Sequence, residues 1–176
     1  VVQLAWQLHE DNGALVEQKD FLIRPDGFNI PYKAQSVHGI STALAQQEGV
    51  SMAEALAAFS AFVGEAVLIA HNGHRFDAKF LTAACEQQRL NSRPVALIDS
   101  MHFSKRLFGT TRGTSHGLDA VLTRTQVTTF NGRRHDARGD VSALAQAVER
   151  MWRQLNLDAA CSGIPRAGTH LPKVSP

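Results

Sequence analysis

Two short segments combine carboxylates with histidine, the residue types that can activate water beside a metal ion. The first is His71–Asp77 (HNGHRFD), and the second is His135–Asp140 (HDARGD). Carboxylate oxygens suit hard ions such as Mg²⁺, and a neutral imidazole can take a proton from an attacking water. We therefore single out Asp77, His135 and Asp140 as candidate residues of a divalent-metal hydrolase.

Each of these residues alone has an ordinary explanation. Asp77 and Asp140 stand at expected helix starts, where unpaired backbone amides and the helix dipole favour a carboxylate. His135 in a polar loop is by itself typical of a solvated side chain. Position favours a site, because Asp77 closely follows the apolar run at 66–70 and open α/β sheets place their sites beyond strand ends.

Hydrophobic periodicity predicts the elements that would position these residues. Residues 1–8 and 15–23 read as strands on either side of a turn at 11–13, which predicts a hairpin. A capping-box pattern at Ser51 and Glu54 predicts an amphipathic helix over 51–64. Buried strands are expected at 66–70 and 94–98, helices at about 76–90, 118–124 and 140–155, and a loop at 36–41. Strands that alternate with helices indicate an α/β fold with a mixed sheet.

Composition and charge narrow the class of protein. The 176 residues suffice for one domain, and 44% hydrophobic with 19% charged residues is ordinary for a globular chain. Two cysteines without a Cys-x-x-Cys pair predict a reduced, intracellular (cytoplasmic) setting. No apolar run approaches the roughly 20 residues that span a membrane. Residues 105–138 carry seven basic and two acidic side chains, which suits either a phosphate backbone or a solvated loop.

The two segments resemble the second and third motifs of the DnaQ-like, DEDDh 3′→5′ exonuclease family, which includes RNase T and the DNA polymerase III epsilon subunit. Val37–Ile40 and Ile98–Ser100 also match recurrent segments of that family, so the likeness covers roughly residues 1–152. Three residues separate the His-Asn and Phe-Asp pairs of the first segment, where bacterial proofreading subunits usually have two. This spacing is more similar to the TREX group, which degrades single-stranded or frayed DNA ends.

The resemblance implies an RNase H-like fold, with a mixed central sheet flanked by helices, and hydrolysis assisted by two Mg²⁺ or Mn²⁺ ions. It makes Asp140 a direct metal ligand, gives Asp77 the second ion, and makes His135 the general base. Nucleoside monophosphates would leave from a DNA 3′ end, with RNA as the alternative substrate and repair or proofreading as the context. Candidates for nucleic-acid contact are Asn72, Arg75, His38, Arg133 and Arg134.

The first motif of the family, Asp-x-Glu, is absent from the sequence. In relatives it lies on a strand just before a segment like Val1–Leu8, so residues 1–157 are expected to form an exonuclease domain without its first strand. Residues 158–176 show no periodicity, which predicts a flexible C-terminal tail that could contact a polymerase or another protein.

Two hypotheses follow from the missing motif. Either the chain is a fragment of a complete exonuclease, or it is a catalytically inactive relative that binds nucleic acid or a partner. Retention of His135 favours the first, because a protein that only binds has no need of a general base beside a metal-binding carboxylate.

Other functional classes fit less well. An HD-type phosphohydrolase could use the pair His135-Asp136, but it needs further His and Asp ligands on helices. A nucleotide-binding Rossmann domain needs a Gly-rich turn between strand and helix, and Gly109–Gly117 does not follow a strand in that way. A plain binding module stays open, because the basic stretch 105–138 alone would bind DNA without sequence preference.

Overall fold

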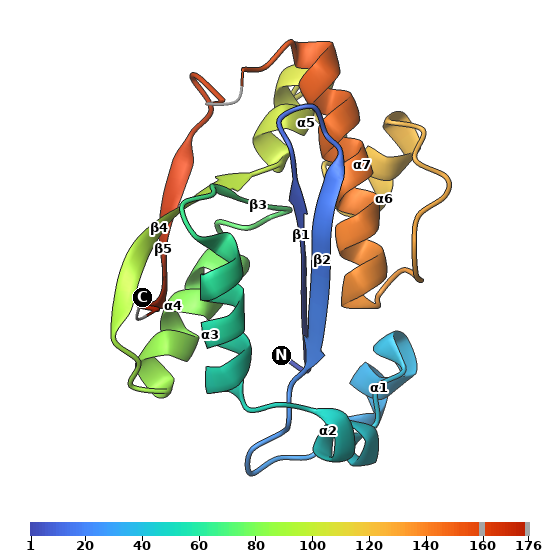
Figure 1. The fold of residues 1–176 in the computed structure, drawn as a ribbon. Coiled ribbons are helices and arrows are strands. Elements are labelled where there is room, and N and C mark those ends of the chain that lie inside the picture. The colour runs from blue at the N-terminus through green and yellow to red at the C-terminus, as the bar shows by residue number, and fades with distance from the viewer. Residues whose placement is uncertain (159–160, 175–176) are drawn as a thin grey trace.

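Helices pack on both faces of the β-structure in the computed structural model, which describes residues 1–158 and 161–174 (Figure 1). The strands are β1 (Gln3–His9), β2 (Leu15–Leu22), β3 (Leu68–Ala70), β4 (Ser92–Asp99) and β5 (Arg166–Pro172). The helices are α1 (Tyr32–His38), α2 (Thr42–Glu48), α3 (Met52–Val63), α4 (Asp77–Gln87), α5 (Met101–Phe108), α6 (Leu118–Arg124) and α7 (Ala137–Leu155). The predicted α/β class is confirmed.

The predicted hairpin is formed by β1 and β2. The two strands pair antiparallel from Gln3↔Leu22 onwards, and the positive φ of +89° at Gly13 lets the intervening turn close. Among the described residues, β1 is hydrogen-bonded to β2 and to no other strand. The hairpin is therefore a two-stranded sheet of its own.

The second sheet has the order β3-β4-β5 and contains both kinds of strand pairing. β3 runs parallel to β4 in a register that sets Ala70 beside Asp99, and β4 runs antiparallel to β5. A mixed sheet is thus present as predicted, but the strands are divided between two sheets rather than joined in one. Since parallel strands end at the same edge, the segments that follow Ala70 and Asp99 leave the sheet side by side.

Beside a small apolar cluster around Ile40, two large apolar cores flank the strands. One lies under α3 and α4 and contains Trp6, Leu56, Leu81 and Leu171 among its buried members. The other lies under α5, α6 and α7 and includes Phe103, which is fully buried. Figure 1 shows α3 and α4 on one side of the hairpin and α6 and α7 on the other. The segments His71–Asp77 and His135–Asp140 consequently enter helices of opposite layers.

The prediction of a flexible tail is wrong for Arg166–Pro172. These residues form β5, in which the side chains of Thr169 and Leu171 are completely buried. Thr169 also donates its hydroxyl to the Ala78 carbonyl of α4 at 2.8 Å. The alternation of inward residues was hidden by the Gly and Pro residues around it, which are typical of loops. Residues 159, 160, 175 and 176 of the predicted tail lie outside the described residues.

Smaller differences concern the ends of elements. The expected loop at 36–41 begins as the last turn of α1, which continues to His38. The expected strand at 66–70 is shorter and only half-buried, because β3 has a single strand partner among the described residues. None of the helices in the described ranges is long and apolar enough to cross a membrane.

Candidate active site

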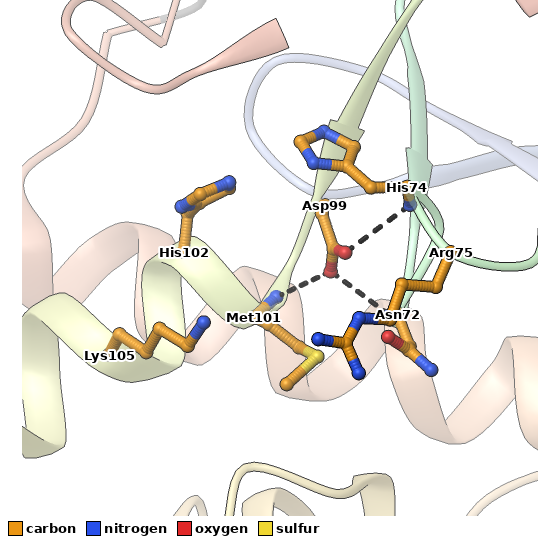
Figure 2. Close-up of a pocket in the computed structure, with 7 residues that line it drawn as sticks. All are labelled: Asn72, His74, Arg75, Asp99, Met101, His102 and Lys105. Atoms are coloured by element: carbon orange, nitrogen blue, oxygen red, sulfur yellow. Dashed lines mark hydrogen bonds between the residues drawn. The ribbon is translucent and has the colours of Figure 1, made fainter. Parts of the chain in front are cut away.

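Asp99 ends β4 and is only 5% exposed. Its carboxylate accepts backbone N–H bonds from Asn72 at 3.0 Å, His74 at 3.3 Å and Met101 at 3.0 Å (Figure 2). The first two donors belong to the loop after β3, and the third begins α5, where the first N–H groups lack helical partners. Asp99 therefore ties the His71–Asp77 segment to the start of α5.

Close packing fixes the same loop from inside the molecule. A Cβ atom on Gly73 would lie 2.8 Å from the side chains of both Ala70 and Leu97, so only glycine fits without displacement. The Nδ1 atom of His71 lies 2.9 Å from the Ser100 hydroxyl oxygen. Burial lowers the pKa of His71, so its ring is neutral at neutral pH and suited to a bond with a neutral hydroxyl.

A cavity of about 230 Å³ opens beside Asp99. Figure 2 shows Arg75, from the loop after β3, and Lys105, from α5, around this space. Burial lowers the pKa of His102, and the positive charges of neighbouring groups, His74 first among them, add to the fall. Arg75 and Lys105 bring two positive charges to the cavity, and the Asp99 carboxylate is bonded to backbone N–H groups. The full lining is Asn72, His74, Arg75, Asp99, Met101, His102 and Lys105.

Asp77 is the first residue of α4, where the sequence predicts it. Burial raises the pKa of its carboxyl group against the opposing effect of a backbone hydrogen bond, and the negative charge of Asp99 adds to the rise. A carboxylate in these surroundings is stabilised by any nearby cation, because a cation favours the ionised form.

His135 and Asp140 meet where α7 begins. His135 has a left-handed backbone with φ of +68°, and its N–H donates to Asp140 Oδ1 at 3.1 Å. The helix begins at Ala137, three residues earlier than the expected start at Asp140, because the Asp136 carboxylate caps it by accepting the Arg138 N–H at 3.0 Å. Asp140 thus lies in the first turn, and the His135 side chain is exposed to solvent.

Arg134 joins two carboxylates across this loop. Its Nε and NH2 atoms donate to Asp119 Oδ1 at 2.9 and 2.7 Å, and its NH1 atom donates to Asp140 Oδ1. Asp119 lies in the first turn of α6. The guanidinium therefore connects the starts of α6 and α7.

Gly139 allows the loop to lie directly against α7, since a Cβ there would collide with the backbone carbonyl of Arg133. Arg133 itself is exposed, and its NH2 atom lies 4.0 Å from the place of a Cβ on Gly39, just after α1. His38 uses its Nδ1 to accept the Ile40 N–H at 3.1 Å. Nucleic-acid contact by His38 and Arg133 stays a prediction.

The carboxylates of Asp77 and Asp140 are of the type that Mg²⁺ or Mn²⁺ prefers, so they fit as ligands by their chemistry. Within residues 1–158 and 161–174, however, no group of three or more His, Cys, Asp or Glu side chains lies in position to hold an ion. Both the role of the two carboxylates as metal ligands and their convergence on one pair of metal ions stay predictions.

Two of the predicted sets of residues are held together by direct contacts. The Arg75 N–H donates to the Asn72 carbonyl at 3.1 Å in the wall of one cavity, and Arg134, His135 and Asp140 form one bonded cluster. The positive charge of Arg134 contributes, after burial and other groups, to the low pKa of His71, so the two sets are electrostatic neighbours. Sequence reasoning missed three participants. Asp99 carries a signal as a polar strand end and as part of the family-like segment Ile98–Ser100, and Lys105 as one of the basic residues in 105–138, whereas Asp119 has none.

Comparison with known proteins identifies the family. The model of the RNase T exonuclease family matches residues 7–148. A curated relative from Rhodobacter capsulatus, named DNA polymerase III subunit epsilon-like protein, is 36% identical over 133 residues. That alignment covers 75% of this chain and 18% of the relative, so the chain spans about a fifth of the relative's length.

Solved structures show the same fold. Exonuclease X in complex with 5′ overhanging duplex DNA is 21% identical, with a TM-score of 0.66 over 92% of this chain and 87% of that one. A 3′-exonuclease that recognises the histone mRNA stem-loop is 16% identical, with a TM-score of 0.77 over 98% of this chain and 66% of that one. The nuclease domain of 3′hExo, a DEDDh family member bound to rAMP, is 16% identical, with a TM-score of 0.74 over 94% and 84%. The chain thus has the RNase H-like fold predicted from its motifs, and it belongs to the DnaQ-like, DEDDh exonuclease family of nuclease hydrolases.

Proposed function

We propose that this domain serves a metal-dependent 3′→5′ exonuclease that removes nucleoside monophosphates from single-stranded or frayed DNA ends. The observation that carries the proposal is the contact between His135 and Asp140 at the start of α7. It holds the backbone of His135, whose side chain is exposed, against a carboxylate of the right chemistry for a divalent ion. Because the sequence contains no Asp-x-Glu, the activity is proposed for the full-length protein.

The side chains divide the chemistry between them. Asp140 and Asp77 would hold divalent ions, which stabilise the charge on the entering and leaving oxygens of the phosphodiester when bound. His135 would take the proton of the attacking water at a ring nitrogen, and its backbone N–H bond to Asp140 ties the residue to the carboxylate proposed to bind a metal ion. The water oxygen then forms the new bond to phosphorus as the bond to the departing 3′ oxygen breaks.

The basic cavity beside the loop after β3 supports a polyanionic substrate. Arg75 and Lys105 bring two positive charges to its lining, while the Asp99 carboxylate is bonded to backbone N–H groups. A phosphate backbone is drawn to such a surface, and the attraction falls as salt rises. Arg75 lies two residues before Asp77, so a strand held there would run close to the proposed chemistry.

The decisive experiment incubates the full-length protein with 5′-labelled single-stranded DNA and RNA oligonucleotides in Mg²⁺ or Mn²⁺. We expect the label to move stepwise into shorter products, and EDTA to stop the reaction. His135→Ala should slow it at least about 100-fold, the usual range for loss of a general base. His170→Ala is the matched control, because it removes an exposed histidine from β5.

If both labelled oligonucleotides keep their full length with Mg²⁺ and with Mn²⁺, the exonuclease proposal is refuted. A His135→Ala rate equal to that of the control would refute the assigned base. The similar solved structures include an exonuclease in complex with duplex DNA and one that recognises an mRNA stem-loop, so the two substrates are run side by side. The nucleic acid that is degraded faster identifies the substrate class.

Two observations favour a second candidate, an inactive relative that binds nucleic acid or a partner protein. Arg134 donates to Asp140 Oδ1, and the described residues contain no three-ligand metal group. Such a protein would bind labelled oligonucleotides without shortening them, and binding would weaken in Arg75→Ala and Lys105→Ala but not in Lys173→Ala. The epsilon-like relative suggests a polymerase as the partner, which a pull-down with the full-length protein would test.

A further inference from the structure

The Oδ1 atom of Asp140 receives two hydrogen bonds, one from the Arg134 side chain and one from the His135 backbone N–H. The same guanidinium places its other two donors on Asp119, at 2.9 and 2.7 Å. Asp140 is about a third exposed and Asp119 is largely exposed. Arg134 is thus shared between a surface carboxylate and the carboxylate proposed to hold a metal ion.

We propose that Arg134 and a divalent metal ion compete for Asp140, and that Asp119 retains the arginine when the ion binds. This inference rests on the proposed function, because it requires Asp140 to be a metal ligand. Arg134 is then a positioning residue, whose guanidinium holds the Asp140 carboxylate at the start of α7 until a metal ion replaces the guanidinium.

The hydrogen bonds around Arg134 allow this exchange without leaving its guanidinium unpaired. An ionised carboxylate oxygen has about two lone-pair sites, and on Oδ1 both are in use. An ion bound through this oxygen therefore displaces one donor, and a cation repels the guanidinium more strongly than it repels a backbone amide. Because Nε and NH2 already bond Asp119, the guanidinium keeps a partner after it leaves Asp140. The bond from the His135 N–H persists, so the proposed base stays in place.

Competition is measured by titrating the full-length protein with Mn²⁺ and following the free ion by electron paramagnetic resonance. Arg134→Met should tighten Mn²⁺ binding by about threefold to fivefold, the range that a partly exposed ion pair contributes. Asp119→Asn should weaken it by about twofold, because Arg134 then loses its alternative partner. Arg138→Met is the charge-matched control, since Arg138 pairs with Asp136 in the same turn and should change the affinity far less.

The outcomes separate this inference from the proposed function. If Asp140→Asn leaves Mn²⁺ binding unchanged, Asp140 is no metal ligand, and the proposed function loses the observation on which it rests. If Asp140→Asn abolishes binding while Arg134→Met has no effect, the proposed function survives and competition is refuted. Equal tightening in Arg134→Met and Arg138→Met also overturns the inference, because a general loss of positive charge then explains both.

Discussion

The Asp99 carboxylate joins three backbone segments at the carboxyl edge of the β3-β4-β5 sheet. It accepts N–H bonds from Asn72 and His74 of one loop and from Met101 at the start of α5. Its buried charge is thereby satisfied by dipoles instead of water. Through these bonds it fixes the loop that carries Arg75 and leads into α4 at Asp77.

Replacing Asp99 should therefore destabilise the whole domain. We expect Asp99→Ala to lower the free energy of unfolding by about 3 kcal/mol, because buried N–H groups without an acceptor cost about 1–3 kcal/mol each. Urea unfolding followed by circular dichroism measures the change. Asp26→Ala, which removes an exposed carboxylate after β2, should stay within about 0.5 kcal/mol of the parent. Equal stabilities of the two variants would contradict the role of Asp99.

Side chains that are close in sequence were the ones that sequence reasoning could pair. Asp140 follows His135 by five residues across a helix start, and the two are in contact. The role of Asp99 could not be predicted, because its partner Asn72 is 27 residues away and meets it through the parallel register of β3 with β4. Arg134 was predicted to contact nucleic acid, but its ion pair with Asp119 depends on how α6 packs beside α7.

The start of α7 depends on a charged cap. Asp136 accepts the Arg138 N–H and pairs with the Arg138 guanidinium at 2.8 Å. The side-chain hydrogen bond from Arg138 is the main cause that lowers the pKa of Asp136 to about 2, from an ordinary value of 3.8. This cap fixes the turn from which Asp140 projects and the loop that carries His135.

A lowered pKa in the folded state gives stability that is present above the ordinary pKa and is lost on acidification. For Asp136 this stability is lost as the pH drops from about 4 to about 2. Asp136→Asn keeps a capping side chain but removes the charge, so its stability deficit should be constant above pH 5 and shrink steadily towards pH 3. Urea unfolding at a series of pH values tests this, with Asp26→Asn as the control. A deficit that does not change with pH would show that the charge of Asp136 is irrelevant.

Helices were easier to predict than strands for a physical reason. The capping box of Ser51 and Glu54 is present in α3, and α6 spans the predicted residues Leu118–Arg124, because caps and helical periodicity are local. The unpaired edge and short length of β3 depend on which strands lie beside it among the described residues, so no local pattern reports them. The motif residues were found by their residue types and by their likeness to the second and third motifs of the family, and both signals lie within short segments of the sequence.

Considered as a whole, the domain has two large apolar cores that share one strand. β4 sends Val95 into the core under α3 and α4, and Ile98 into the core under α5, α6 and α7. β5 pairs with β4 along its length and adds Leu171 to the first core. The loop that precedes β5 adds Ile164 to the second. The carboxyl edge that presents Asp99 is therefore supported by residues far along the chain.

Substitutions in β5 test directly whether the residues after Leu157 belong to the folded domain. Leu171 is fully buried, so Leu171→Ala should lower the free energy of unfolding by about 2–5 kcal/mol through the lost contacts and the cavity left behind. Val174→Ala, at a side chain that is 47% exposed, is the matched control and should change stability little. A chain ended at Leu157 should be destabilised further, because β4 then loses its antiparallel partner and both cores lose buried residues. If Leu171→Ala and the shortened chain both unfolded at the urea midpoint of the parent, the stretch after Leu157 would be a dispensable tail after all.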